Sequence, residues 1–293
     1  MSIAIIANPE AGRGLGRRTA QEIEELFSAQ GIEFQMLRTR APREAIELSR
    51  RASRCHPVVV ALGGDGTIGE VLEGMWDSDA VLGIIPAGTG NDYARSLRLP
   101  RNPLKAASVV LEGKTTTMDV GIERDKVFGV MASIGFPVSV IQRVNAREDK
   151  GFKGPATIVA SIWKSLNTLK PFDVSITIDD HTYEERIVGL FVMNMSHGGG
   201  GLNIAPDAIY NDGQFTIVLM LELTGLQLLK ALPKVYLGRH KNHPAVRFHT
   251  GTRFQIHQSG YQKMFDGDLH GTTPLCAHII RGGARIRVPD RSE

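Results

Sequence analysis

The chain has 293 residues, of which 42% are hydrophobic and 22% are charged, a composition typical of a globular protein with room for two domains. A net charge of +3 is too small to indicate a nucleic-acid-binding protein, although it does not oppose contact with an anionic surface. Cys55 and Cys276 lie far apart in the sequence, no apolar run approaches the length of a membrane span, and the first residues lack the pattern of a secretory signal. We therefore expect a cytosolic protein without structural disulfides.

The first 118 residues alternate between predicted strands and predicted helices. Short apolar runs predict the strands, and amphipathic spacing with Gly or Pro at the ends predicts the helices. The predicted strands are Ile3–Ala7, 32–37, 58–62 and Val81–Pro86, and the predicted helices are 19–30, 42–54, 68–75, a short segment from Tyr93, and Pro103–Glu112. This alternation indicates a parallel sheet with helices on both faces.

A glycine-rich loop at residues 63–67, with the sequence GGDGT, separates the third predicted strand from a helix. Glycines without a Cβ let backbone N–H groups approach a ligand, and a helix N-terminus favours anions. Asp65 would repel a phosphate in this loop unless a divalent cation lies between them. The pattern predicts a nucleotide-phosphate site that uses magnesium, and a plain tight turn is the alternative.

A second loop at residues 88–92, with the sequence GTGND, follows the fourth predicted strand in the same way. Parallel strands present their carboxyl ends at one edge of a sheet, where open α/β sheets bind ligands. Asp65 and Asp92 could therefore face one cleft as magnesium ligands, directly or through water. Asn91 and Asp92 could also simply cap the following helix, and the two roles can coexist.

After about residue 118 the pattern changes to strands separated by few helices. The predicted strands are 126–134, Phe172–Ile178, 186–195, 214–221, 247–258 and 277–288, with turn signals at 179–180 and 211–213. This pattern indicates an antiparallel sheet or sandwich. We expect residues 1–124 to form an α/β domain and residues 125–293 a β-sandwich domain, with the alternative that the extreme C-terminus returns to the first domain.

Two segments of the second half, 156–169 and 221–241, have apolar residues near helical spacing. A membrane-touching amphipathic helix is possible for each, but a helix that buries one face on the sandwich is more common. Pro233 is expected to break the second segment. His240 and His243 have a spacing that could ligate a metal, but no cysteine or carboxylate cluster accompanies them, so we interpret them as surface residues.

Five motifs spread between Asn8 and Asp268 carry a resemblance to a known family: GGDGT, PAGTGNDYAR, Asp119-Val120-Gly121, APDAIYNDG and FDGD. Together they resemble the diacylglycerol kinase catalytic family, in particular the small bacterial lipid kinases related to sphingosine kinases. GGDGT alone is shared with NAD kinases and phosphofructokinases, whereas GTGNDYAR with APDAIYNDG is far more specific. The resemblance implies an α/β N-terminal domain with a parallel sheet, of the NAD kinase or diacylglycerol kinase type, and a C-terminal antiparallel β-sandwich domain that carries the acceptor side of the cleft.

The resemblance also implies roles for individual residues. ATP would be held by Asn8, Pro9, Glu10, Ala11, Gly12, Thr39, Gly64, Asp65, Gly66, Thr67, Ile68, Gly69, Glu70 and Thr89. Magnesium would be bound by Asp65, Asp92 and Asp119, and a second, structural magnesium by Asp212 with the help of Ile209 and Gln214. For Asp212 alone, a hairpin turn is the alternative, because Asp-Gly is a strong turn signal.

The FDGD motif at residues 265–268 departs from the family, whose usual form ends in a glutamate that is thought to deprotonate the lipid hydroxyl. Asp268 stands there instead and is one methylene shorter, and a base must come within hydrogen-bond reach of its proton. Either the backbone lies closer, or a water bridges the gap, or another acid such as Asp65 serves, or the enzyme is slow or inactive. The candidate catalytic residues are thus Asp268 and Asp65.

The expected activity is transfer of the γ-phosphate of ATP to a lipid hydroxyl, with diacylglycerol as the default acceptor. We expect peripheral contact with the inner face of the membrane, where the acceptor resides, and no nucleic-acid partner; whether the chain forms a homo-oligomer is left open. One alternative is a kinase for a soluble acceptor, of the NAD kinase type. The other is a non-catalytic nucleotide- or lipid-binding relative, which is an alternative because Asp268 replaces the usual glutamate of the family.

Overall fold

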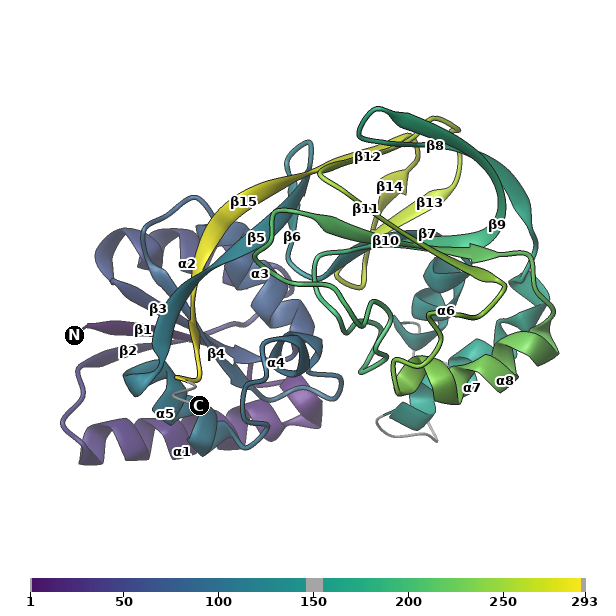
Figure 1. The fold of residues 1–293 in the computed structure, drawn as a ribbon. Coiled ribbons are helices and arrows are strands. Elements are labelled where there is room, and N and C mark those ends of the chain that lie inside the picture. Colours follow the sequence, from purple (N-terminus) through teal and green to yellow (C-terminus); the bar gives the residue numbers. More distant parts are fainter. Residues whose placement is uncertain (1, 146–154, 291–293) are drawn as a thin grey trace. The chain divides into compact units, whose positions relative to one another are not determined.

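The computed structural model describes residues 2–145 and 155–290, which form two compact units. The first unit comprises residues 2–120 and 281–290, and the second is Gly121–Ile280. The chain leaves the first unit within β5 (Lys114–Glu123) and returns to it within β15 (Leu275–Val288) (Figure 1). None of the helices in the described part of the chain is long and apolar enough to cross a membrane.

The first unit contains a parallel sheet in the order β2-β1-β3-β4-β15. Its strands, besides the end of β15, are β1 (Ile3–Ala7), β2 (Phe34–Arg38), β3 (Val58–Gly63) and β4 (Val81–Pro86). Every residue of β1, β3 and β4 is buried, which explains why these strands are continuous apolar runs in the sequence. The predicted parallel sheet is confirmed.

The helices of the first unit pack in two pairs, α1 with α5 and α2 with α3, on opposite faces of the sheet (Figure 1). Their bounds are α1 (Leu15–Ala29), α2 (Glu44–Cys55), α3 (Asp65–Met75), α4 (Asp92–Ser96) and α5 (Pro103–Glu112), with a 3-10 turn η1 (Ala11–Arg13) before α1. A Cβ on Gly74 would lie 2.2 Å from the carbonyl oxygen of Ile46, so this glycine allows α3 to approach α2 closely.

Helix α3 begins earlier than the sequence predicts. Gly64 is its extended N-cap residue, and Asp65 stands in the first turn, where the helix dipole favours an acidic side chain. The loop predicted at residues 63–67 is therefore shorter than expected, because Gly63 ends β3, Gly64 caps α3 and the rest of GGDGT is helical. This shift places the aspartate on a rigid element.

The second unit is built on antiparallel strands in the order β14-β13-β7-β9-β8-β12-β15, with β10 paired to β9 and β11 to β10. The bounds are β6 (Lys126–Phe128), β7 (Met131–Gly135), β8 (Phe172–Ile178), β9 (His181–Met193), β10 (Phe215–Leu221), β11 (Val246–Gly251), β12 (Arg253–Ile256), β13 (Gln262–Phe265) and β14 (Asp268–Thr272). Phe128 stacks on Phe215 and contacts Phe265 at the centre of the core. The predicted antiparallel β domain is confirmed.

Two strands predicted as continuous are each split by a distant carboxylate. The segment 126–134 is interrupted between β6 and β7, where Asp266 accepts hydrogen bonds from backbone N–H groups. The segment 247–258 is interrupted at Thr252, whose N–H donates to Asp179 at 2.9 Å. In both places a side chain replaces the hydrogen bonds that a neighbouring strand would make.

The second unit has more helix than the sequence predicts. It contains α6 (Phe136–Asn145), α7 (Pro155–Lys164), η2 (Leu166–Thr168) and α8 (Gly225–Tyr236). Helix α8 begins at a capping box of Thr224 and Gln227, and it continues through Pro233, so the expected break there is wrong. The interpretation of His240 as a surface residue is also wrong, because it is 3% exposed and its Nε2 bonds the carbonyl oxygen of Ile204 at 2.9 Å.

Candidate active site

A polar pocket of ≈ 430 Å³ lies in the first unit at the carboxyl ends of β1, β2 and β3. Strand β1 lies between β2 and β3 in the sheet. The connection after β1 leads to β2 on one side of it, and the connection after β2 leads back past β1 to β3 on the other side. Open α/β sheets bind ligands at such a reversal of strand order. The residues that line the pocket are Asn8, Glu10, Ala11, Thr39, Arg40, Ala41, Pro42, Gly64, Gly66, Thr67 and Glu70.

This pocket brings together most of the residues expected to hold ATP. Those outside its lining are Pro9, Gly12, Asp65, Ile68, Gly69 and Thr89. Ile68 is fully buried among the apolar residues of α3, whereas Thr89 is exposed on its loop. Sequence reasoning missed Arg40, Ala41 and Pro42, although their place directly after the end of β2 was a usable signal. The nucleotide-binding roles of all these residues stay predictions.

Hydrogen bonds hold the walls of the pocket in place. The Nδ2 of Asn8 donates to the Oγ1 of Thr67 at 3.1 Å and so joins the loop after β1 to the first turn of α3. The backbone N–H of Thr39 donates to the carbonyl oxygen of Ala7 at 2.9 Å. A Cβ on Gly12, whose φ is 57°, would lie 2.3 Å from the carbonyl oxygen of Ala87, so no other residue fits this turn.

Glu70 supports the pocket wall from α3. Its Oε1 accepts a hydrogen bond from the backbone N–H of Arg43 at 3.2 Å, and the Arg43 guanidinium pairs with Glu73 at 3.1 Å. Arg43 has a left-handed backbone with a φ of 65°. These bonds fix the loop after β2 against α3, and the shape of the pocket depends on that position.

The two glycine loops contact each other. A Cβ built on Gly88 would lie 2.6 Å from the Cα of Gly64, so the backbones could not approach this closely with larger residues. The Oδ1 of Asn91 accepts a hydrogen bond from the N–H of Gly88 at 3.0 Å, and Asn91 itself is left-handed with a φ of 52°. The predicted meeting of the two loops at one edge of the sheet is thus present in the structure.

Asp65 and Asp92 lie together where these loops meet. The Oδ1 of Asp65 accepts a hydrogen bond from the backbone N–H of Tyr93 at 3.2 Å, and Asp92 is buried in the first turn of α4. Burial, and then the negative charge of Asp92, raise the pKa of Asp65 to about 7, although nearby backbone N–H groups act in the opposite direction. Because the charge of Asp92 acts on Asp65, the pair favours binding of a proton or a cation.

The carboxylate pair fits a magnesium ion. Magnesium in phosphoryl-transfer sites is usually held by one or two carboxylates together with substrate phosphates and water. Within the described residues, no group of three or more His, Cys, Asp or Glu side chains is placed to hold a metal by itself. A magnesium ion held by these two carboxylates would need further oxygen ligands from substrate or water.

Asp119 is buried in β5 and has a structural partner. Its Oδ1 accepts a hydrogen bond from the backbone N–H of Gly282 in β15 at 2.7 Å. This bond links two segments of the first unit that lie far apart in the sequence. The expected role of Asp119 as a magnesium ligand stays a prediction.

The expected structural magnesium site around Asp212 is an exposed turn in the second unit. The Oδ1 of Asp212 accepts a hydrogen bond from the backbone N–H of Gln214 at 2.9 Å, which is the turn expected as the alternative. The side chain of Ile209 is exposed, as is that of Gln214. Binding of a metal by these three residues stays a prediction.

Asp266 positions the hairpin that carries Asp268. Its carboxylate accepts hydrogen bonds from the successive N–H groups of Gly129, Val130 and Met131 at 2.8, 2.9 and 2.9 Å. Asp266 and Gly267 form the turn between β13 and β14 with positive φ angles, and Asp268 is the exposed first residue of β14. Sequence reasoning assigned no role to Asp266, because its partners lie more than 130 residues away.

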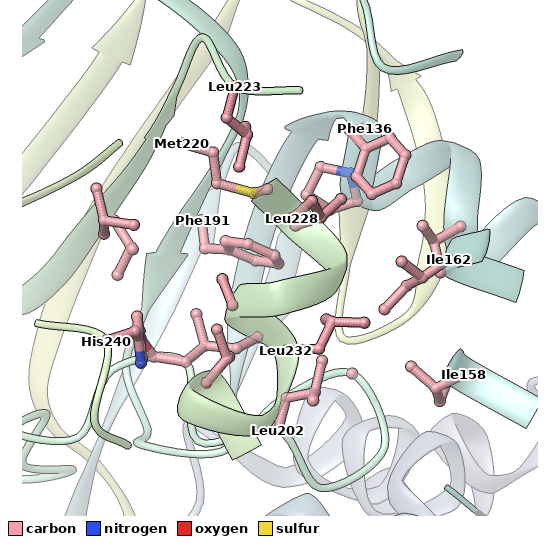
Figure 2. Close-up of a pocket in the computed structure, with 18 of the residues that line it drawn as sticks. Phe136, Ile158, Ile162, Phe191, Leu202, Met220, Leu223, Leu228, Leu232 and His240 are labelled. Carbon is pink, nitrogen blue, oxygen red and sulfur yellow. The ribbon is translucent and has the colours of Figure 1, made fainter. Parts of the chain in front are cut away.

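An apolar pocket lies in the second unit between the sheet and α6, α7 and α8, with a volume of ≈ 110 Å³ (Figure 2). Phe191 and Met220 line it from the strands, and Leu228 and Leu232 line it from α8. Its walls expose almost no polar surface, so it suits an alkyl chain and not a charged or sugar-like group. The sequence alone did not place these residues in a pocket.

Family models match both parts of the chain. The model described as diacylglycerol kinase catalytic domain matches residues 2–122, and the model described as YegS C-terminal NAD kinase beta sandwich-like domain matches residues 130–287. The chain belongs to the diacylglycerol kinase catalytic family. This membership confirms the resemblance carried by the five sequence motifs.

Relatives over nearly the whole chain bear the name diacylglycerol kinase. The proteins from Staphylococcus saprophyticus and Bacillus subtilis are each 28% identical over 92% of this chain and 90% of their own length. A Mycobacterium tuberculosis diacylglycerol kinase is 29% identical over 98% of this chain and 94% of its own. A Bacillus anthracis diacylglycerol kinase structure, 23% identical, covers 99% of this chain and 97% of its own with a TM-score of 0.77. Another Bacillus anthracis structure is 22% identical and covers 99% of this chain and 95% of its own, with a TM-score of 0.85. These two structures establish that the fold is shared.

Proposed function

We propose that this kinase of the diacylglycerol kinase catalytic family transfers the γ-phosphate of ATP to the hydroxyl group of a lipid, with diacylglycerol as the default acceptor. The observation that carries the proposal is the contact of two glycine loops beside the Asp65–Asp92 pair, at the strand-order reversal of a parallel sheet. The names of the relatives support the choice of acceptor. Nucleotide binding is assigned to residues 1–124 and acceptor binding to residues 125–293.

ATP would occupy the polar pocket of the first unit, with its phosphates toward Gly64 and the first turn of α3. Backbone N–H groups and the helix dipole favour phosphate there. Arg40 supplies a positive side chain at the pocket wall, and Asn8 and Thr67 supply polar groups. This arrangement supports binding of a charged triphosphate better than binding of an apolar ligand.

Asp65 and Asp92 would hold a magnesium ion, and Asp119 is the third candidate ligand. When bound, magnesium would neutralise phosphate charge in the transition state of phosphoryl transfer. The raised pKa of Asp65, which comes from burial and then from the negative charge of Asp92, supports this assignment, since a cation would offset that repulsion. Asp212, Ile209 and Gln214 are the proposed ligands of a second, structural magnesium.

Asp268 is the proposed base for the acceptor hydroxyl. In the reaction the acceptor O–H bond breaks and its proton passes to the Asp268 carboxylate, while the oxygen forms a bond to the γ-phosphorus and the bond to the ADP oxygen breaks. Asp266 would act as a positioning residue through its bonds to the backbone before β7. If the shorter side chain does not reach the acceptor, a bridging water or Asp65 would take this role.

The apolar pocket of the second unit supports a lipid acceptor over a soluble one. A pocket whose walls are aliphatic and aromatic gains free energy from burying an alkyl chain, at about 25 cal/mol per Å². A polar acceptor of the NAD kinase type would gain nothing from these walls. Membrane contact would follow from such an acceptor, because its alkyl chains reside in the bilayer.

The test is phosphate transfer from ATP to diacylglycerol in detergent micelles, with NAD and sphingosine as competing acceptors. We expect the wild type to form phosphorylated diacylglycerol and Asp65→Ala to form none. We expect Asp268→Ala to be inactive and Asp268→Glu to keep partial or full activity. Phosphorylation of NAD alone would overturn the choice of acceptor. Binding of ATP without turnover by any of these proteins would support the non-catalytic alternative.

A further inference from the structure

The helical elements of the second unit carry basic and no acidic side chains. Across the described elements α6, α7, η2 and α8 there is no aspartate or glutamate, and the charged residues are Arg143, Lys164, Lys230 and Lys234. The helices of the first unit differ, because α1 and α2 mix both signs and form ion pairs such as Arg18–Glu22 and Arg51–Glu47. An ordinary solvated helix face resembles α1 and α2.

The same helices expose large apolar side chains. Trp163 on α7 is 63% exposed, Leu226 on α8 is 63% exposed, and Leu237 directly after α8 is 61% exposed. Val159, one helical turn before Trp163, is also exposed. Single exposed apolar residues are normal, but this group is concentrated on two helices of one apolar cluster.

Helix α8 has two distinct faces. Leu226, Lys230, Lys234 and Leu237 are spaced so that they share its exposed face. Leu228 and Leu232, on the opposite face, line the apolar pocket (Figure 2). The outer leucines therefore do not build the pocket, and their exposure needs another explanation.

An anionic lipid surface fits this face better than a protein partner does. Tryptophan is favoured at the boundary between water and lipid, leucines gain free energy in the acyl region, and lysine stems extend their ammonium groups to phosphate. The core of a protein interface is instead depleted in lysine. Glu222, which lies before α8, is in an ion pair with Arg186, and Arg186 also pairs with Asp173.

We propose that the outer faces of α7 and α8 dock on the surface of an anionic phospholipid bilayer. Trp163, Leu226 and Leu237 insert as apolar anchors, and Lys230 and Lys234 bind the headgroup phosphates. The proposal rests on the proposed lipid kinase function for its purpose, because the docked helices also wall the acceptor pocket. A lipid would then pass from the bilayer into the pocket without crossing water.

The test is cosedimentation with vesicles of phosphatidylcholine, with and without phosphatidylglycerol. The wild type is expected to bind the anionic vesicles much more tightly. The double substitution of Lys230 and Lys234 by Ala is expected to lower this affinity about 30-fold, since each lysine contributes about 1 kcal/mol at an anionic surface. The double substitution of Leu226 and Leu237 by Ser is expected to lower it about tenfold or more.

Matched controls come from α5 of the first unit, where Leu104 is 42% exposed and is followed by the exposed Lys105. Leu104→Ser and Lys105→Ala are expected to leave vesicle binding unchanged. Trp76→Phe leaves Trp163 as the single tryptophan, whose fluorescence is expected to shift to shorter wavelength on anionic vesicles. An equal loss of binding in the α5 variants, or no shift of the Trp163 emission, would overturn the proposal.

Activity in detergent micelles separates this proposal from the proposed function. Both double variants, the one at Lys230 and Lys234 and the one at Leu226 and Leu237, are expected to keep wild-type turnover of diacylglycerol in micelles. Both are expected to lose turnover on vesicles. Turnover in micelles by a wild type that does not bind vesicles would overturn docking and leave the kinase function intact. Vesicle binding without any turnover would support docking and overturn the proposed kinase function. If the wild type is a dimer and the leucine variant a monomer, the face is an interface between copies and the docking proposal is wrong.

Discussion

The Oδ1 of Asp65 accepts a hydrogen bond from the backbone N–H of Tyr93 at 3.2 Å, and this bond joins the two glycine loops of the first unit. One residue opens α3 after the first loop, and the other belongs to α4 after the second. The Asp65 carboxylate therefore ties the first segment to the second across the edge of the sheet. The bond also explains why Asp65 stays in place beside Asp92 despite their repulsion.

Asp65→Asn is predicted to stabilise the metal-free protein at pH 8. The folded pKa of Asp65 is raised to about 7 from an ordinary value of 3.8, so the folded state binds the proton more tightly than the unfolded state. The free energy of unfolding contributed by this group therefore falls as the pH rises from about 4 to about 7. Urea unfolding in EDTA should show a more stable variant at pH 8 and no difference near pH 4. A variant that is less stable at pH 8 would contradict the raised pKa.

Magnesium is predicted to stabilise the wild type and to have little effect on Asp65→Asn. A ligand that binds only the folded state raises its stability with the logarithm of its concentration. Thermal unfolding in the presence of ATP, with increasing magnesium, should raise the midpoint of the wild type only. Potassium chloride at the same ionic strength serves as the control for salt effects. An equal rise in both proteins would place the metal elsewhere.

Asp266→Ala and Asp268→Ala are predicted to differ in their effect on stability, although both lower kcat. Asp266 accepts three backbone hydrogen bonds, so its removal is expected to lower the free energy of unfolding by about 3 kcal/mol and to lower kcat through the displaced hairpin. Asp268 is exposed, so its removal should leave stability nearly unchanged and lower kcat by about 10²–10⁴. Urea unfolding and micelle assays on both variants measure the two quantities. Unchanged stability in Asp266→Ala would argue against the positioning role.

Lys263→Met is predicted to destabilise the second unit by about 3–5 kcal/mol. The Nζ of Lys263 lies 2.9 Å from Glu123, and both side chains are at most 5% exposed, so the substitution leaves a buried carboxylate without its partner. Adding Glu123→Leu should recover most of this loss, because a pair of apolar residues needs no counter-charge. A double-mutant cycle by urea unfolding checks the prediction. A double variant no more stable than the single one would show that other groups at the site depend on Glu123.

Gly88→Ala is predicted to weaken ATP binding about tenfold or more while the protein stays folded. The added Cβ would lie 2.6 Å from the Cα of Gly64, so the two loops must move apart. A displacement of about 1 Å at a phosphate site is enough to cost this much. Calorimetric titration with Mg·ATP measures the affinity, and circular dichroism checks the fold. Wild-type affinity in this variant would show that the contact between the loops is not required.

The sequence predicts the strands of the first unit well because each is fully buried and therefore continuously apolar. Helix α5 was placed at its observed bounds because Pro103 and Gly113 mark its ends. Contacts between distant segments were not predictable in this way. The bonds of Asp266 to residues 129–131 and of Asp179 to Thr252 split two strands without any local signal. Helix α6 was missed because its short apolar run also fits a strand.

The candidate site shows the same division. GGDGT and GTGND correctly indicated that the two segments and the Asp65–Asp92 pair lie together, since strand ends in a parallel sheet meet at one edge. No local pattern indicates that the Asp65 carboxylate accepts a hydrogen bond from the amide of Tyr93, or that Glu70 holds the loop at Arg43. The apolar pocket was equally hidden, because its walls come from three helices and several strands that look like ordinary core residues.

The most direct test of the central claim is a crystal structure with magnesium and a non-hydrolysable ATP analogue. The predicted result has the triphosphate against the backbone of Gly64 and Gly88, with magnesium bound by Asp65 and Asp92. A triphosphate bound away from both glycine loops, or a metal with no ligand from this carboxylate pair, would contradict it.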